Sequence, residues 1–282
     1  MMSRVLVFVL LTSTAWADPI ACIRAGVEHV FVDTGEYVLT ETLSIPSNVT
    51  IYCAPNVTFI AASGAFKGIH DSLVEIKGTN NAIQNCSFKM LREMYTEANG
   101  YPSSEWRHGL SLVGATNIRL DEIFVIDSGG DGVFIGPRID GPYSEDRHPS
   151  ERITIDRLTA TGNYRNGLAI TSCVNCTVRN STFENTIGTS PSAGFIIEPD
   201  HGGDRALVVV ERCVSKNNAG SAFFVQMKKQ NQNSQPISVT FKDCVGMGIP
   251  HGHTLIRVDN FNKNEIPVKP AGKICWNDSC WP

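Results

Sequence analysis

The chain is built of short segments in which apolar and polar residues alternate, and two kinds of such segment follow one another repeatedly. Alternation with a period of two, together with many Val, Ile and Phe residues, predicts β-strands. In the first kind a glycine precedes the apolar positions, and its copies are HGLSL (108–112), DGVFI (131–135), NGLAI (166–170), AGFII (193–197) and, with the glycine shifted, SAFFV (221–225). The copies of the second kind are AIQNCSF (82–88), IRLDEIFV (118–125), ITIDRLTA (153–160), CTVRNSTF (176–183), LVVVERCV (207–214) and SVTFKDCV (238–245).

Successive copies lie roughly 23 to 36 residues apart, a repeat length that is typical of solenoid proteins. No helix-length periodic segment lies between the copies, so the connections are not βαβ crossovers. The pattern therefore predicts an all-β, single-domain protein in which coils of short strands stack in parallel.

Residues 1–17 show the pattern of a secretory signal peptide, because Arg4 precedes the apolar run VLVFVLL and Ala15-Trp16-Ala17 forms a small-x-small cleavage site. The apolar run is too short to span a bilayer. We therefore expect a secreted protein with no membrane span, whose mature chain begins near Asp18.

Residues 18–261 are predicted to form one β-helix domain, and residues 262–282 an irregular tail rich in Pro and Trp. At the start of the domain, residues 18–30 predict a short amphipathic helix with Asp18 as N-cap and Pro19 at the first helical position. Such a helix would cover the terminal edge of the solenoid, where unpaired strand groups otherwise invite aggregation.

Three of the nine cysteines fall into one column when the second kind of segment is aligned. Cys86, Cys213 and Cys244 share this column with Ile and Leu residues of other copies. An inward-facing column of this kind predicts buried free thiols, since free Cys behaves as a small hydrophobic residue.

Other cysteines are better candidates for disulfides in a secreted chain. The pair in CWNDSC (275–280) comes first, because the tail has little core of its own, and Cys22 with Cys53 is a second candidate pair. The CVNC segment (173–176) has a CxxC spacing, but no second such pair and no paired His accompanies it, so no metal site is predicted there.

The long connections cluster around the strands of the glycine type. Residues 136–152 and 226–236 follow two of these strands, whereas residues 91–107 precede another, and a moderate connection, 184–192, precedes a fourth. Insertions concentrated on one face of a repeat protein usually mark its binding face. Two rims flanking a flat sheet predict an open groove that suits an extended chain.

The interleaved strand units, with the opening VDTGEYVLTETLSIPSNVTI (32–51), resemble the pectate-lyase-like superfamily over nearly all of the mature chain. The resemblance implies a right-handed parallel β-helix, and most members of this superfamily are extracellular enzymes that act on polysaccharides. The sharper motifs of its branches are missing. SGGDG (128–132) and HGL (108–110) lack the paired Asp and the RIK of polygalacturonases, and the WxDH and RxxPxxR patterns of calcium-dependent pectate lyases are absent. EPDH (198–201) contains residues similar to those of the DPHD motif of mannuronan epimerases, but in a different order. The resemblance therefore assigns no catalytic residue in this chain.

Candidate catalytic residues lie at the ends of the glycine-type strands, on adjacent coils. Because coils are spaced by about 4.8 Å, neighbours in one column come within roughly 5–10 Å, the range in which paired carboxylates act on a glycosidic bond. Asp131 is alternatively a turn residue, Glu198 and Asp200 are alternatively surface acids, and His108 is alternatively structural. Glu198 and Asp200 are also candidate ligands of calcium, the one cofactor that the sequence suggests. The candidate catalytic residues are Asp131, Glu198, Asp200 and His108.

A second set of polar and aromatic residues on the same face is predicted to bind substrate. Arginine pairs with uronate carboxylates through a fork of N–H donors, and an outward-facing aromatic ring can stack on a sugar. The set consists of Arg107, Phe134, Arg138, Tyr164, Arg165 and Lys228.

The net charge of −4 provides no basic stripe for nucleic acid, although a groove can be locally basic on an acidic protein. We expect a polysaccharide lyase or glycoside hydrolase that acts on an acidic, uronate-containing polysaccharide. A lyase would abstract the C5 proton with a base while a cation stabilises the carboxylate, whereas a hydrolase would pair Asp131 with Glu198 or Asp200. The alternatives are a polyuronate epimerase and a non-catalytic β-helix that binds glycans or serves as a structural surface protein.

Overall fold

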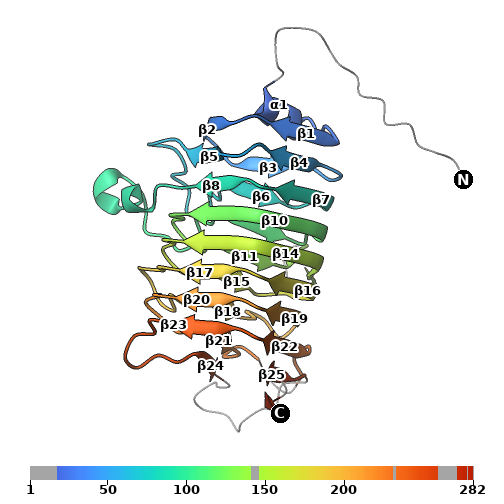
Figure 1. Cartoon of the computed structure of the whole chain (residues 1–282), viewed down its shortest axis with the longest axis vertical. Coiled ribbons are helices and arrows are strands. Elements are labelled where there is room, and N and C mark those ends of the chain that lie inside the picture. The colour runs from blue at the N-terminus through green and yellow to red at the C-terminus, as the bar shows by residue number, and fades with distance from the viewer. Residues whose placement is uncertain (1–17, 141–145, 231–232, 260–271, 278, 282) are drawn as a thin grey trace, which may run out of the picture.

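The computed structural model describes residues 18–140, 146–230, 233–259, 272–277 and 279–281. These residues form a column of coils stacked along one axis, from blue at the N-terminal end to red at the C-terminal end (Figure 1). Strands of successive coils pair in parallel and in register along two sheets. The predicted all-β, single-domain right-handed parallel β-helix is confirmed, and so is its short capping helix. The predicted signal peptide, 1–17, lies outside the described residues.

One sheet of sixteen strands forms two branches that meet at β10 and β14. The main path is β1 (His29–Val32), β4 (Thr50–Cys53), β7 (Thr79–Gln84), β10 (Thr116–Ile126), β14 (Ser150–Thr161), β16 (Cys173–Arg179), β19 (Ala206–Glu211), β22 (Ile237–Lys242), β25 (Ile274–Trp276) and β26 (Ser279–Trp281). The other branch holds β2 (Gly35–Leu39), β5 (Val57–Ala61), β8 (Ser87–Lys89), β17 (Thr182–Glu184), β20 (Val214–Lys216) and β23 (Val245–Met247).

The bend between the two branches depends on one residue per coil in the left-handed region. In β10 and β14 these residues are Glu122 and Arg157, with φ of 55° and 57°, and in other coils the position is held by Asn85 and Asn180. Asn tolerates this conformation better than most residues. Two of the sequence's N-x-S/T triplets therefore arise from the geometry of the bend.

The second sheet has eight strands and corresponds to the glycine-type segments. It runs through β3 (Leu43–Ile45), β6 (Val74–Ile76), β9 (Leu110–Val113), β11 (Val133–Gly136), β15 (Leu168–Ile170), β18 (Phe195–Ile197), β21 (Phe223–Gln226) and β24 (Ile256–Asp259). One apolar residue of each glycine-type strand, namely Leu110, Val133, Leu168, Phe195 and Phe223, is fully buried in the core, as alternation requires. A separate hairpin of β12 (Arg138–Ile139) and β13 (Arg147–His148) lies in the long connection after β11.

Both ends of the column carry covering elements. In α1 (Pro19–Arg24) the side chain of Asp18 accepts a hydrogen bond from the backbone N–H of Ile20 at 3.0 Å, and Ile23 is fully buried, as the N-cap pattern predicts. At the other end, β25 pairs in parallel with β22 and folds back on β26, so the described part of the predicted irregular tail is ordered. Trp276 packs there against Phe223 and Phe241.

The cysteine predictions are partly confirmed. Cys275 and Cys280 form a disulfide, and Cys213 and Cys244 are buried free thiols, as expected. Cys86 is buried but is not free: it is joined to Cys53, so the predicted Cys22–Cys53 pair is wrong and Cys22 is a free thiol.

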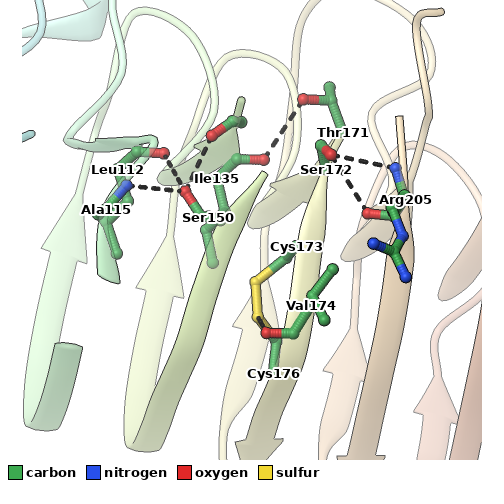
Figure 2. Close-up of a disulfide and its surroundings, with 11 residues drawn as sticks. Leu112, Ala115, Ile135, Ser150, Thr171, Ser172, Cys173, Val174, Cys176 and Arg205 are labelled. Carbon is green, nitrogen blue, oxygen red and sulfur yellow. Dashed lines mark hydrogen bonds between the residues drawn. A yellow bond between two sulfur atoms is a disulfide. The ribbon is translucent and has the colours of Figure 1, made fainter. Parts of the chain in front are cut away.

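The CVNC segment holds a further disulfide, Cys173–Cys176, within β16 (Figure 2). The register of β16 against β19 shifts between Val174 and Cys176, and both sulfur-bearing residues are buried. Beside the disulfide, Ser150 accepts a hydrogen bond from the N–H of Ala115 in the preceding coil at 3.1 Å (Figure 2). The CxxC spacing thus corresponds to a disulfide within one strand.

The described residues include no helix that is long and apolar enough to cross a bilayer. The two helices other than α1, η1 (Arg92–Met94) and η2 (Glu97–Asn99), are single 3₁₀ turns in the connection before β9.

Candidate functional site

The polar residues that precede the glycine-type strands fasten each coil to the next. Nδ1 of His108 accepts the backbone N–H of Asp131 at 3.1 Å, Oδ1 of Asp131 accepts the N–H of Asn166 at 3.1 Å, and the side-chain oxygen of Asn166 accepts the N–H of Ala193 at 3.0 Å. We call these three residues, His108, Asp131 and Asn166, the acceptor ladder. A buried backbone N–H without a partner is costly, so the ladder explains why this column is polar.

The acceptor ladder changes the role of Asp131. Its side chain is 0 % exposed, and Oδ1 also accepts a hydrogen bond from the side-chain amide of Asn166 at 2.7 Å. Complete burial raises the pKa of the Asp131 carboxyl, although Arg165 and Asn166 oppose this effect. A group with no exposed surface cannot contact a glycan, so the role of Asp131 is to hold neighbouring groups of the protein in position.

His108 is held in the neutral form. Burial lowers the pKa of its imidazole to about 3, and the nearby charges of Arg165 and His70 act in the same direction. Nδ1 lies 3.4 Å from Oδ2 of Asp131, but because Nδ1 accepts the N–H of Asp131, this approach is not an ion pair. The ring also stacks on Phe134, with centroids 4.7 Å apart. With Nδ1 occupied, the proton resides on Nε2, so His108 is suited to donating a hydrogen bond and not to general base catalysis.

Arg165 joins carboxylates from three coils. Its guanidinium lies 2.7 Å from Glu198, 3.5 Å from Asp131 and 3.6 Å from Glu105. Burial disfavours the charge of Arg165, but these carboxylates outweigh that cost and raise its pKa. We call Arg165, Asp131, Glu198 and Glu105 the Arg165 cluster.

Glu198 is a partly accessible acid of this cluster. It follows β18, its side chain is 14 % exposed, and its other oxygen accepts a hydrogen bond from Gln226. Burial raises the pKa of the Glu198 carboxyl, Arg165 opposes this, and the charge of Asp200 reinforces it. A carboxyl with a raised pKa, held in a fixed position at a surface, is suited to general acid catalysis.

Glu105 reaches the cluster because of two glycines in the next coil. The connection 91–107 crosses the turn at Gly129 and Gly130, where a Cβ on Gly130 would lie 2.5 Å from the backbone oxygen of Glu105. A Cβ on Gly129 would meet the ring of Tyr95 at 2.4 Å. The two glycines of SGGDG therefore permit close packing of the connection.

Arg107 anchors the same connection from inside. It is fully buried, and its guanidinium donates to the backbone oxygens of Phe66, Lys67 and Pro102 at 2.9–3.2 Å. Its charged group also lies over the ring of Tyr95. This burial is at odds with the prediction that Arg107 binds substrate, because its donors serve backbone carbonyls.

The outward residues of the second sheet lie in register from Ser111 to Phe224, as alternation predicts. Ala169, Ile196 and Phe224 are nevertheless buried and form a small apolar cluster with Phe134 packed against it. The guanidinium of Arg257 lies 4.7 Å above the ring of Phe224. The middle of the outer face is thus apolar and closely packed, and Phe134, which is partly exposed, stacks on His108.

The rim at the ends of these strands is tied together by a buried ion pair. Arg147 contacts Asp204 with two hydrogen bonds of 2.8 and 3.0 Å, and Oδ2 of Asp204 also accepts the N–H groups of Asp200 and His201. Bidentate Arg–carboxylate pairs fix geometry strongly. The position of Asp200 beside Glu198 is therefore set by a pair that joins the long connection 136–152 to the connection between β18 and β19.

The other predicted rim residues are exposed. Asp200 pairs with Lys229 at 2.8 Å, and Arg138 pairs with Asp140 at 2.9 Å. Lys228 is exposed next to Lys229. These residues border the outer face but do not touch the Arg165 cluster in any contact of the described residues.

Tyr164 lines a pocket away from the Arg165 cluster. It lines a pocket of about 430 Å³ with Arg92, Tyr95 and Ile187, on the side of the connection 91–107. A Cβ on Gly188 would lie 2.4 Å from the Tyr164 ring, so the ring packs on that glycine. Tyr164 therefore lies at the opposite rim from Asp200.

One group of possible metal ligands occurs among the described residues, at the β12–β13 hairpin. Asp140, Asp146 and His148 bring their ligand atoms within 4.8 Å of one another. His148 already contacts both carboxylates, at 3.2 and 3.1 Å, and all three groups are exposed. Calcium prefers oxygen ligands, so a set that includes an imidazole does not fit the predicted calcium, and exposed ion pairing accounts for the group.

The structure thus brings together His108, Asp131, Arg165 and Glu198, four of the predicted site residues. Two members of the site were not predicted, Glu105 and Gln226. The signal for Glu105 was present in the paired glycines Gly129 and Gly130, which indicate that another segment crosses the turn.

No protein-family model matches the chain. A curated relative is the uncharacterized protein YclG of Bacillus subtilis (strain 168), 32% identical over 113 residues, which are 39% of this chain and 19% of YclG. The chain therefore spans about one fifth of that relative's length.

Among solved structures, the pre-mature gene product 12 of bacteriophage phi29 has a TM-score of 0.70 at 17% identity, covering 91% of this chain and 34% of that protein. An iota-carrageenase complexed to iota-carrageenan fragments has a TM-score of 0.54 at 14% identity, covering 88% and 54%. A 1,3-α-1,4-β-D-galactose-4-sulfate-3,6-anhydro-D-galactose-2-sulfate 4 galactohydrolase has a TM-score of 0.53 at 14% identity, covering 78% and 51%. At these identities the likeness concerns the fold, which these proteins share with the chain, whereas membership of the pectate-lyase-like superfamily stays a prediction.

Proposed function

We propose that the protein binds an acidic polysaccharide along the outer face of the second sheet and hydrolyses it at the Arg165 cluster. The observation that carries this proposal is Glu198, a partly accessible carboxyl whose pKa is raised by burial and whose position is fixed by Arg165 and Gln226. Two β-helix proteins of similar fold carry names that refer to carrageenan fragments and to a sulfated galactose chain.

In this proposal Glu198 protonates the leaving oxygen and Asp200 serves as the second carboxylate. Asp200 lies two residues further along the same strand exit, is half-exposed and is placed by Asp204. Paired carboxylates at roughly 5–10 Å hydrolyse glycosidic bonds. Asp131 is not part of the pair, because it is fully buried, and acts by holding Arg165 and the next coil.

The exposed cations of the rim support an acidic ligand. Arg138, Lys228 and Lys229 lie on this side of the sheet and are open to solvent. Sulfate or uronate groups of a bound chain would meet them as charge-assisted contacts. Trp106, 42 % exposed and stacked on His70, offers an aromatic face at the opposite rim for a sugar ring.

The test is a screen of the purified chain against iota-carrageenan, pectate, alginate and a neutral glucan. We expect new reducing ends on at least one acidic polymer and none on the glucan. New ultraviolet absorbance of an unsaturated sugar would instead assign a lyase, and altered uronate stereochemistry without cleavage an epimerase. Binding without any turnover would contradict the enzymatic proposal and favour a glycan-binding β-helix.

A further inference from the structure

Two free thiols lie on top of one another in the last complete coils. Val214 pairs with Val245 and Glu211 with Lys242 in the parallel ladders, so Cys213 and Cys244 occupy the same position in neighbouring coils. Both are buried and both belong to the hydrophobic core. Neighbouring parallel strands are about 4.8 Å apart, and this spacing falls within the range of roughly 4.4–6.8 Å between the Cα atoms of a disulfide.

The side chains of the two cysteines also have matching orientations. Each sulfur lies over the carbonyl oxygen two residues before it, Cys213 at 3.4 Å and Cys244 at 3.4 Å. Each sulfur also lies near a carbonyl oxygen of the preceding coil, that of Val178 at 3.7 Å for Cys213 and that of Val210 at 3.5 Å for Cys244. The sulfur of Cys244 is therefore directed toward the coil that holds Cys213, and closing a bond between the two requires side-chain rotation but no rearrangement of the fold.

The chain contains its own precedent for such a bond. Cys86 occupies the equivalent position in an earlier coil and has its sulfur over the carbonyl oxygen of Gln84 at 3.2 Å. It is joined to Cys53, at the end of β4 in the preceding coil, with Cα atoms 5.3 Å apart and a sequence separation of 33 residues. The equivalent position of that coil is Val57, which precedes the ladder pair of Thr58 with Ser87, so the bond shows that a cysteine of this column can be linked to a cysteine of the neighbouring coil.

We propose that Cys213 and Cys244 form a second disulfide between coils under oxidising conditions, so that the C-terminal coils carry a covalent clasp. With a glutathione disulfide as oxidant, the thiolate of one cysteine attacks the reagent and releases one glutathione thiol. The second cysteine then attacks the mixed disulfide, forming the Cys213–Cys244 bond and releasing a second glutathione thiol. The protein loses two hydrogen atoms and the reagent gains them.

The experiment counts thiols in the full chain, refolded from the reduced state with mixtures of oxidised and reduced glutathione. Without the clasp, three thiols react with Ellman's reagent after denaturation, those of Cys22, Cys213 and Cys244. We expect one, and a peptide pair linking Cys213 to Cys244 in the non-reduced digest. Three reactive thiols in the oxidised protein, or a link from either residue to Cys22, would overturn the proposal.

Two variants make the count specific. Cys22→Ser should lower the count to zero, because both remaining free thiols are consumed by the clasp. Cys213→Ser should raise the count to two, from Cys22 and Cys244, and should remove the increase in the denaturation midpoint that oxidation gives the parent chain. If Cys213→Ser does not fold, the linked peptide in the Cys22→Ser protein still decides the question.

Discussion

Nη2 of Arg165 lies 2.7 Å from Oε2 of Glu198, and the bond joins the beginning of β15 to the end of its neighbour β18. The outward position of β15 is Ala169, which pairs with Ile196 of β18. The contact between Arg165 and Glu198 connects the two rims of the outer face at the point where the acidic groups gather.

Replacing Glu198 by Gln should abolish the proposed acid step while leaving the fold intact. Loss of a general acid typically costs about 10²–10⁴-fold in rate, and we expect a decrease of this size in the release of reducing ends. Gln keeps an oxygen for Arg165, so the far-ultraviolet circular dichroism should not change. Glu36→Gln on β2, an exposed position of the other sheet, is the matched control. Parent-like turnover by the Glu198→Gln protein would exclude Glu198 as the acid.

Replacing Arg165 by Met should destabilise the protein strongly. Arg165 is only 13 % exposed, and its removal leaves Asp131 and Glu198 without their common cation. Breaking a buried ion pair from one side typically costs about 3–5 kcal/mol. Urea unfolding monitored by circular dichroism measures the free energy of unfolding, and the exposed Arg138→Met should change it far less than Arg165→Met does. Equal effects of the two variants would mean that the Arg165 cluster is not a stabilising unit.

Comparing Asp131→Asn with Asp131→Ala should separate two contributions of Asp131 to stability, its hydrogen-bond acceptor and its negative charge. Asn keeps an oxygen for the backbone N–H of Asn166, whereas Ala leaves this N–H and the amide of Asn166 unpaired. Unsatisfied buried donors cost about 1–3 kcal/mol, so Asp131→Ala should have the lower free energy of unfolding by that amount. The comparison is made by chemical denaturation at neutral pH, and indistinguishable variants would remove the acceptor ladder as an explanation for this residue.

The charge of Asp131 should also make stability depend on pH. Burial raises its pKa in the folded state above the value of about 3.9 expected when unfolded. The folded protein therefore binds the proton more tightly, and its stability falls as the pH rises from about 4 through the raised pKa. Over this window the free energy of unfolding of the parent should fall relative to that of Asp131→Asn, whose amide does not titrate. A rise of the parent's value relative to the variant's would contradict a raised pKa.

Gly130→Ala should displace the connection 91–107. The new Cβ would lie 2.5 Å from the backbone oxygen of Glu105 and 2.9 Å from the N atom of Arg107, and backbone atoms cannot yield easily. We expect a lower denaturation midpoint and faster proteolysis within 91–107. Gly202→Ala is the control, because there the nearest atom belongs to a side chain, the Oγ of Ser234 at 3.1 Å, and the nearest backbone atom is 3.9 Å away. The same protease sensitivity in both variants would argue against close packing at Gly130.

The repeats were sufficient to predict the architecture, because apolar alternation in each coil directly reflects which side chains face the core. They also predicted the buried column of Cys86, Cys213 and Cys244, but not that Cys86 is bonded to Cys53, since burial does not specify a covalent partner. Alternation could show that His108 and Asp131 lie in one column. It could not show that their acceptors face the next coil's backbone, because a polar residue before a glycine has the same pattern in either role.

The site was less predictable for a related reason. Glu105 and Arg165 are far apart in sequence and meet only because the connection 91–107 crosses the next coil. Arg107, two residues from Glu105, points inward and is fully buried. Within a long connection no periodic pattern shows which side chains point inward and which point outward. The charge of Arg107 therefore suggested substrate binding, whereas the residue in fact holds the connection in place.

The acceptor ladder has a consequence for how such a chain can change in length. Asp131 and Asn166 each satisfy the same backbone group of the following coil, although they are different residues. A gene segment encoding one whole turn of the column, for example residues 131–165, carries with it the fastening to whatever turn comes next. After duplication or loss of such a segment, the hydrogen bond between the newly adjacent coils would still form. The column can therefore lengthen or shorten by single coils, while the sequences of the rim connections change independently.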